Sequence, residues 1–120
     1  MSGKLCVSIS FGKDNTDKAT VGFVVANAAV GSGKETVVFL SIEGVRLCQK
    51  GYADDIHEEG FDPLKSLMDK FVGAGGKIFV CSPCFKKRKL DENAIIPGAA
   101  VVGGAKLVEF MSDGCPSLSY

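Results

Sequence analysis

Apolar stretches rich in β-branched residues alternate with helix-forming stretches along nearly the whole chain, and this alternation constrains the fold most strongly. The stretch over residues 36–42 (Thr-Val-Val-Phe-Leu-Ser-Ile) is almost continuously apolar, which is typical of a parallel strand covered on both faces. Strands that alternate with helices predict an α/β fold, here a three-layer sandwich around a mainly parallel, five-stranded sheet. The strands are expected over residues 4–11, 36–42, 77–80, 94–102 and 115–120.

Caps and periodic apolar positions predict the helices between these strands. The first helix runs to about Val30 and begins at Asp14 or Asn15, either of which can cap it. A β-branched run at residues 21–25 makes a strand the competing interpretation there. Asp62-Pro63 marks the start of another helix, whose apolar residues recur every three or four positions.

The remaining elements are shorter. Helical segments or turns are expected over residues 45–50, 85–90 and 103–112, the last with Ala105, Leu107, Val108 and Met111 facing inward. Pro97 predicts that the strand over residues 94–102 lies at a sheet edge or contains a bulge. The Gly-Ser-Gly-Lys-Glu segment at 31–35 follows a helix rather than a strand, so it is interpreted as a turn and not as a phosphate loop.

Length and composition favour one soluble globular domain over residues 1–120. The chain has 46% apolar and 23% charged residues and a formal net charge of zero. Zero net charge gives no support to a partner such as nucleic acid or an anionic membrane. No stretch has the length of a membrane span, and residues 1–4 lack the apolar core of a signal peptide. A cytoplasmic location is therefore expected.

Two of the five cysteines, Cys81 and Cys84, lie where a strand ends and a helix is expected to begin. Ser82 can cap that helix and Pro83 suits its first turn. The carboxyl ends of parallel strands form the edge at which α/β proteins usually bind ligands and carry out chemistry. In a reducing compartment, an odd number of cysteines indicates free, catalytic or metal-bound thiols rather than structural disulfides.

The surroundings of this pair suggest thiol chemistry. The cations at residues 86–89, beginning with Lys86, are expected to favour the reactive thiolate. Pairs with this spacing occur in redox proteins, in sulfur carriers and in zinc sites. A zinc site would need Cys48 and His57 as further ligands, and nothing in their spacing indicates one, so neither a metal nor another cofactor is predicted.

Polar residues after two other strands are candidates for supporting the pair. Glu43 follows the second strand and Asn15 the first, so both are expected at the same edge as Cys81. The alternatives without a role in the site are a solvated loop carboxylate for Glu43 and a helix cap for Asn15. Cys6, inside the first strand, is expected to be buried, and the role of Cys115 is left open.

The segment Val80-Cys81-Ser-Pro-Cys84-Phe-Lys-Lys-Arg-Lys-Leu-Asp-Glu-Asn93 resembles the cysteine loop of the DsrE/DsrF-like proteins. The Phe-Leu-Ser-Ile-Glu-Gly-Val segment at 39–45 is similar to the family's pattern after strand two. The family's closing strand and helix are similar to two further segments of this chain, Ile-Pro-Gly-Ala at 96–99 and residues 103–109. The resemblance covers nearly the whole chain and implies a small α/β sandwich with a parallel sheet and flavodoxin-like topology.

The resemblance also implies a function. In the family's sulfur carriers, a cysteine directly after strand three holds sulfane sulfur as a persulfide, and that position matches Cys81. Some members carry a second cysteine that matches Cys84. The implied partners are proteins that donate and accept sulfur, and the implied assembly is a trimer or a hexamer. The alternatives are an oligomeric binding protein without catalysis and a small dithiol oxidoreductase that uses Cys81 and Cys84. Whether such a relay counts as an enzyme is left open.

Overall fold

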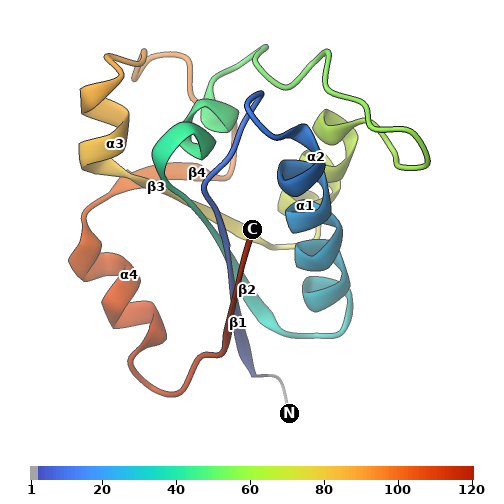
Figure 1. Cartoon of the computed structure of the whole chain (residues 1–120). Coiled ribbons are helices and arrows are strands. Elements are labelled where there is room, and N and C mark those ends of the chain that lie inside the picture. The colour runs from blue at the N-terminus through green and yellow to red at the C-terminus, as the bar shows by residue number, and fades with distance from the viewer. Residues whose placement is uncertain (1–2) are drawn as a thin grey trace.

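The computed structural model describes residues 3–120; Met1 and Ser2, part of the N-terminal segment considered for a signal peptide, lie outside the described residues. Five parallel strands form one sheet in the order β4-β3-β2-β1-β5, with helices on both faces (Figure 1). The strands are β1 (Lys4–Ile9), β2 (Glu35–Leu40), β3 (Lys77–Cys81), β4 (Ala99–Val102) and β5 (Ser117–Ser119). The α/β architecture predicted from the alternation of strands and helices is confirmed.

The strand order shows where the chain reverses direction across the sheet. From β1 to β4 each strand is added on the same side of the last, and β5 then returns to pair with the free edge of β1. The flavodoxin order is 2-1-3-4-5, so the two folds share layers and a parallel sheet but not strand order. Because right-handed crossovers that run in opposite directions lie on opposite faces, this reversal puts the last helix on the other side of the sheet.

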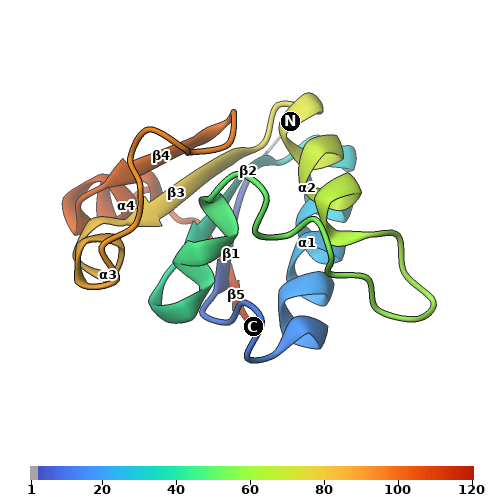
Figure 2. The ribbon, with the colours of Figure 1, turned by 90° about the horizontal axis from the view of Figure 1, so that it is seen from above.

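The helices divide accordingly (Figure 2). On one face, α1 and α2 pack together through the edge-to-face rings of Phe23 and Phe71, whose centroids are 5.9 Å apart. On the other face, Phe110 of α4 meets Phe79 of β3 at 6.2 Å between centroids. The helical elements are α1 (Thr16–Gly31), the 3-10 helix η1 (Ile42–Cys48), α2 (Leu64–Gly73), α3 (Ser82–Lys87) and α4 (Gly104–Met111).

Residues 16–31 form a helix and not the competing strand, because tertiary packing suits a helical stripe there. Ala19, Phe23 and Ala26 are fully buried against the sheet. Gly22 lies on the same face, where an added Cβ would be 2.5 Å from the side chain of Ile9. Small residues at this contact let α1 approach β1 closely, and this packing outweighs the weak helix propensity of the valines.

Several predicted boundaries are wrong by a few residues. The strands over 4–11 and 36–42 end at Ile9 and Leu40, where the chain leaves the sheet for loops at its carboxyl edge. The strand over 94–102 is shortened to Ala99–Val102, because Pro97 and Gly98 form a turn before it. The prediction that this strand lies at an edge is confirmed, since β4 pairs only with β3.

The inward face predicted for the last helix needs a correction. Val108 is 66% exposed and Ala105 is also exposed, whereas Leu107 and Met111 are partly covered. Phe110, which was not among the predicted inward residues, makes the contact with the sheet. The helix is rotated relative to the prediction because a single large ring anchors it. Within residues 3–120, no helix is both long and apolar enough to cross a membrane.

Candidate functional site

Cys81 is the last residue of β3, and α3 begins at the next residue, so the strand passes into the helix without a loop. Cys81 itself occupies the cap position of α3, with Ser82 as the first helical residue. The prediction that Ser82 caps this helix is therefore wrong by one residue. The helix expected to begin at Ser82-Pro83 is thus present, with Pro83 in its first turn. One turn of helix thus brings Cys84 back over Cys81, and both cysteines are partly exposed.

The two thiols interact. Burial raises the pKa of the Cys81 thiol above its ordinary value, and the Cys84 thiol, within hydrogen-bonding reach, raises it further. The backbone N–H of Cys84 and the guanidinium of Arg88 lower this pKa, but burial dominates. The expectation that the basic segment favours the Cys81 thiolate holds for Arg88, but burial outweighs this effect and the pKa is raised overall. The lysine side chains of the segment project into solvent, where they act weakly, while the Cys81 thiol is partly buried.

Glu43 connects this helix to the neighbouring element η1. Its carboxylate accepts a hydrogen bond from Arg88 Nε at 2.5 Å and another from Arg46 Nε at 2.8 Å. The two guanidinium groups, Arg88 first, hold the pKa of the Glu43 carboxyl below its usual range. Arg88 also donates to the Cys84 carbonyl at 3.3 Å. Glu43 is therefore an ionised anchor for Arg88 and not a free acid or base.

Two residues next to Glu43 and Arg88 in the sequence have a strained backbone. Ile42 has φ of 54° and Lys89 has φ of 52°, and they are the non-glycine residues with positive φ in the described chain, residues 3–120. Such a conformation is disfavoured for a side chain with a Cβ, most of all for a β-branched one, and costs of order 1–3 kcal/mol. Each is the sequence neighbour of one member of the Glu43–Arg88 pair.

The close packing of η1 on the sheet explains the strain at Ile42. Gly44 lies so close to β1 that an added Cβ would be 2.3 Å from the carbonyl oxygen of Ile9. The chain must therefore turn sharply after β2, and Gly44 donates its N–H to the Ser41 carbonyl at 2.9 Å across this turn. Lys89 ends α3 with bonds typical of a left-handed helix stop, a position that usually carries glycine.

The other residues proposed from the sequence lie at the same edge with more local roles. Asn15 caps α1, where its side chain accepts a hydrogen bond from the Lys18 N–H at 3.1 Å. This is the capping role that was its alternative interpretation. Lys86 is exposed on α3. His57 is exposed in the loop after η1 and lies 2.7 Å from the Phe61 carbonyl oxygen, away from the thiol pair in the sequence and in its contacts.

The remaining cysteines are set apart from this pair. Cys6 and Cys48 are buried, at 2% and 0% exposure, and burial raises the pKa of each thiol to about 11. Cys115 is partly exposed before β5, and burial also raises its pKa. Among residues 3–120, no three His, Cys, Asp or Glu side chains come together as metal ligands would. Cys48 and His57 therefore do not join Cys81 and Cys84 in a four-ligand site.

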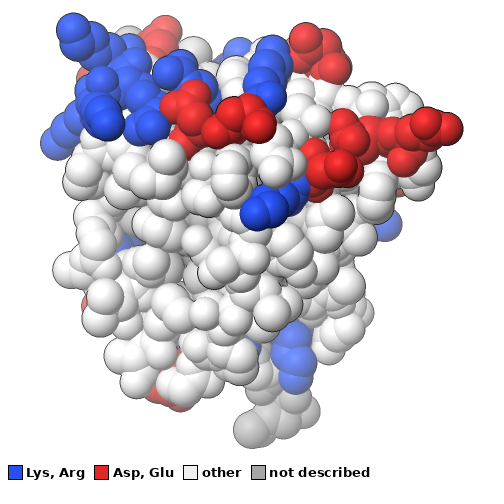
Figure 3. Space-filling model, viewed as in Figure 1, with Lys and Arg blue, Asp and Glu red and all other residues white. Residues whose placement is uncertain are grey.

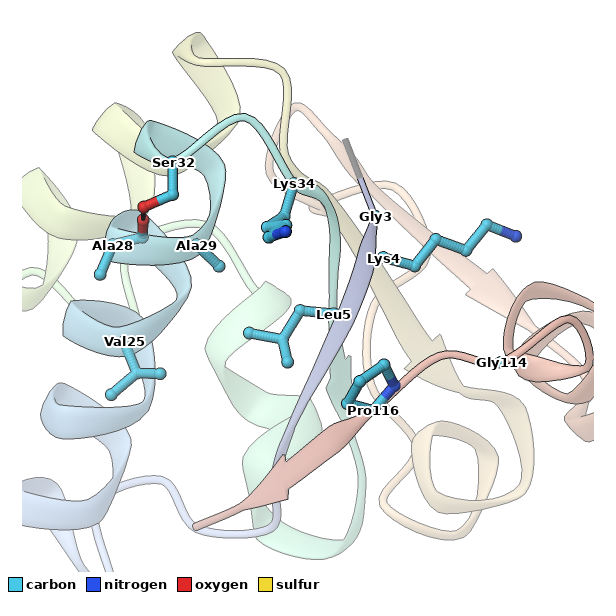
Figure 4. Close-up of a pocket in the computed structure, with 10 residues that line it drawn as sticks. All are labelled: Gly3, Lys4, Leu5, Val25, Ala28, Ala29, Ser32, Lys34, Gly114 and Pro116. Atoms are coloured by element: carbon cyan, nitrogen blue, oxygen red, sulfur yellow. Dashed lines mark hydrogen bonds between the residues drawn. The ribbon is translucent and has the colours of Figure 1, made fainter. Parts of the chain in front are cut away.

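Two cavities lie away from the thiols. The larger, about 570 Å³, opens between α1 and the amino end of β1, and Figure 4 shows Val25 and Leu5 pointing into it with Pro116 below and Lys34 at its rim. The smaller, about 310 Å³, lies between α4 and the amino ends of the strands, against Phe79 and Phe110. Neither of these two cavities is lined by a cysteine.

Arg88 is a residue of the site that the sequence did not single out, because it is one of four consecutive cations. Its side chain is only 12% exposed, unlike its lysine neighbours. Helical spacing carried a signal: residue 88 lies three positions after the buried Phe85 and four after Cys84, so it shares their inner face. Arg46 carried no comparable signal.

A parallel sheet with helices on both faces and a thiol pair at the end of its third strand define a small α/β protein of a known type. The DsrE/DsrF-like family matches residues 3–117, and the chain belongs to this family. The resemblance noted from the cysteine segment is thereby confirmed.

The chain is also similar to two uncharacterized proteins. The chain is 27% identical over 101 residues to the uncharacterized protein MJ0760 of Methanocaldococcus jannaschii, covering 84% of this chain but only 37% of that protein. It is 27% identical over 109 residues to the uncharacterized protein MK0008 of Methanopyrus kandleri, covering 91% of this chain and 87% of that protein. The chain thus spans little more than a third of the length of the first of these relatives.

Solved structures share the fold. The ychN protein from E. coli matches with a TM-score of 0.82 at 15% identity, over 100% of both chains. The protein of unknown function MTH1491 from Methanobacterium thermoautotrophicum matches with a TM-score of 0.68 at 13% identity, also over 100% of both chains. At these identities the likeness concerns the fold alone.

Proposed function

We propose that this protein carries sulfane sulfur as a persulfide on Cys81 and passes it to a protein partner. The observation that carries the proposal is the placement of Cys81: a partly exposed thiol at the end of β3, one helical turn from a second thiol and under the electrostatic influence of the Arg88 guanidinium. Members of the DsrE/DsrF-like family function in sulfur relay, which is consistent with this role. Cys6 and Cys48 are too buried to receive sulfur from another molecule.

Loading proceeds by thiol exchange. The Cys81 thiolate attacks the terminal sulfur of a donor persulfide, a new sulfur–sulfur bond forms at Cys81, and the donor thiolate leaves and takes up a proton. Transfer is the same step in the other direction: an acceptor thiolate attacks the terminal sulfur and Cys81 leaves as a thiolate. Arg88 and the Cys84 N–H favour the anionic form of Cys81, which is the nucleophile in loading and the leaving group in transfer.

Cys84 provides a way to discharge the carrier. If the Cys84 thiolate attacks the inner sulfur of the Cys81 persulfide, a Cys81–Cys84 disulfide forms and hydrosulfide leaves. The short reach between the two thiols makes this step intramolecular. The contact of the two thiols also supports the second candidate function, a dithiol oxidoreductase.

Intact mass after incubation with a low-molecular-weight persulfide tests the proposal. The wild-type protein is expected to gain one sulfur atom, Cys81→Ser to gain none, and Cys84→Ser to keep the adduct for longer because it cannot release hydrosulfide. Cys115→Ser, which removes another partly exposed thiol, is the matched control and should load normally. A wild-type adduct that persists in Cys81→Ser contradicts the carrier role of Cys81. Immediate conversion to the disulfide, with no observable persulfide, favours the oxidoreductase.

The predicted homo-oligomer, a trimer or a hexamer, is part of this proposal. The α4 face of the sheet is only partly covered, and Val108 projects from it. Light scattering coupled to size-exclusion chromatography measures the assembly directly, and a monomer at all concentrations argues against it.

A further inference from the structure

The side chains that surround the thiol pair are displayed at a cost in conformational energy. Ile42 and Lys89 both have positive φ, a region that glycine adopts without strain. Glycine at either position would make the same turn and leave the Glu43–Arg88 pair in place, since that pair uses the neighbouring residues. The backbone therefore does not require isoleucine or lysine there. The side chains themselves call for an explanation, and strained residues cluster at functional sites.

Ile42 presents an apolar side chain to solvent at the same carboxyl edge of the sheet as the thiols. It is 52% exposed, although large aliphatic side chains are usually buried. It follows β2 by two residues, and Leu40 at the end of β2 pairs in register with Val80, the residue before Cys81. Pro83, between the two cysteines, is also exposed. Two exposed apolar side chains, Ile42 and Pro83, thus lie at the same edge of the sheet as Cys81.

Lys86, Lys87 and Lys89 give the same region a positive charge that the protein does not neutralise. All three are exposed, and within residues 3–120 none has a carboxylate within 4.0 Å, whereas Arg88 is paired with Glu43. Figure 3 shows Lys and Arg gathered over α3. Asp and Glu gather mainly over the loop between η1 and α2, on the opposite side of the same edge. Asp91 and Glu92 follow in the next turn and offset the field only in part.

We propose that Ile42, Pro83, Lys86, Lys87 and Lys89, here called the docking surface, bind an acidic segment of the protein that exchanges sulfur with Cys81. This inference rests on the proposed function and names the chemistry of the partner. An acidic side chain on the partner meets the lysines, and an apolar side chain beside its reactive sulfur meets Ile42. A protein segment fits better than a small anion, because the charges are spread along α3 and the two cavities lie elsewhere.

Two matched peptides test the charge preference. Each carries one cysteine activated as a mixed disulfide with neutral thiopyridine, next to one leucine, and one peptide has aspartates where the other has lysines. Attack by the Cys81 thiolate joins the protein to the peptide and releases thiopyridone, whose absorbance reports the rate. A Cys84→Ser, Cys115→Ser background keeps Cys81 as the reacting thiol. The acidic peptide is expected to react roughly tenfold faster at low salt, and the difference to shrink as salt screens the charges.

Charge reversal localises the effect. Lys87→Glu should abolish or invert the preference for the acidic peptide. Lys70→Glu makes the same change of net charge at an exposed position of α2 and should keep most of this preference. Equal rates for the two peptides with the wild-type surface overturn the proposal, and so does an equal loss in Lys70→Glu. A change of oligomeric state in Lys87→Glu identifies the surface as a contact between copies and also overturns it.

The strained residues provide a second readout. Lys89→Gly and Ile42→Asn relieve the backbone, so both variants are expected to unfold at higher denaturant concentration than the wild type. Lys89→Gly should lower the preference for the acidic peptide, and Ile42→Asn should slow both peptides several-fold by removing the contact with leucine. Variants that gain no stability and keep wild-type rates show that these residues only shape the turns, which contradicts the proposal.

Iodoacetamide, which is neutral and small, separates this inference from the proposed function. It should react with Cys81 at similar rates in all the surface variants. If Cys81 takes no sulfur from a persulfide but still prefers the acidic peptide, the carrier role fails and the docking surface stands. If Cys81 loads normally and shows no preference, only the docking surface fails.

Discussion

At the scale of single residues, burial has the largest influence on the chemistry of this protein. A guanidinium and a backbone N–H favour the Cys81 thiolate, yet the pKa of Cys81 is raised because the thiol is partly removed from water. A resting thiol that stays protonated at neutral pH is protected from oxidation, since the thiolate is the form that reacts with oxidants. The thiolate needed for loading is then formed only in part, so loading should accelerate with pH.

The titration of Cys81 tests the coupling of the two thiols. Replacing Cys84 by serine removes a neighbouring group that becomes negative, so the pKa of Cys81 should fall toward that of an ordinary cysteine. The rate of alkylation by iodoacetamide, followed against pH by mass spectrometry, measures this pKa. Cys115→Ser serves as the control and should leave it in place. An unchanged or higher pKa in Cys84→Ser contradicts the thiol contact.

Thr20 offers a test of packing at one residue. It is fully buried in α1, and its hydroxyl has no hydrogen-bond partner among the described residues. Thr20→Val replaces that hydroxyl by a methyl group of similar size, so the free energy of unfolding should rise by about 1 kcal/mol. Thr36→Val is the matched control, because the Thr36 hydroxyl donates to the Lys34 carbonyl at 2.9 Å. Chemical denaturation measures both, and a loss of stability in Thr20→Val would falsify this view.

At the scale of elements, the site depends on the junction of η1 with α3. Neither segment would be stable alone: α3 has six residues and η1 is a 3-10 helix of seven. Gly44 lets η1 lie on the end of β1, and Phe85 buries the inner face of α3. The Glu43–Arg88 pair then joins the two elements over the carboxyl edge of the sheet.

A double-mutant cycle measures this junction. Arg88→Met should lower the free energy of unfolding by about 1–2 kcal/mol, less than a fully buried pair because Glu43 is 33% exposed. It should also raise the pKa of Cys81, since a nearby cation is lost. Arg46→Met is the control: this more exposed partner of Glu43 should cost less than 1 kcal/mol. Additive effects of Glu43→Gln and Arg88→Met would show that the two side chains are not coupled.

At the scale of the whole molecule, the thiol pair and many of the charged side chains gather at one edge of the sheet. The carboxyl ends of the strands carry the thiol pair, the basic helix α3 and the acidic loop between η1 and α2. The lower part of the face in Figure 3 has few charges. The core on the α1 and α2 side is nearly complete, whereas the α4 side is thinly covered. The α4 side therefore offers more uncovered apolar surface to another molecule than the α1 and α2 side does.

The buried thiols make the stability of the whole fold sensitive to alkaline pH. Cys6 and Cys48 keep their protons in the folded state until about pH 11, while the unfolded thiols ionise near 9. The unfolded state thus binds fewer protons between these values. Each thiol that stays protonated contributes at most about 3 kcal/mol to the free energy of unfolding. This contribution is complete below the unfolded pKa and is lost as the pH rises through the folded pKa.

Denaturant unfolding as a function of pH measures this loss. Wild-type stability should fall with a steeper slope above pH 9 than that of Cys48→Ala, which lacks one titrating group. The variant should be less stable at neutral pH because of its cavity, so the slope and not the absolute value is the readout. Cys115→Ser, at a partly exposed position, should change the slope less. Parallel slopes for wild type and Cys48→Ala contradict the prediction.

The amino-acid sequence by itself determined the elements and the position of the thiol pair. Apolar periodicity and local signals such as Asn15 and Pro97 depend on neighbours a few residues away, so they survive without knowledge of the fold. Only the tertiary structure decided the direction in which the pKa of Cys81 shifts, the pairing of Glu43 with Arg88 and the backbone strain at Ile42 and Lys89. These features arise from burial and from contacts between residues about 45 positions apart, as between Glu43 and Arg88. No local pattern records such contacts, because they exist only once β2 and β3 lie side by side.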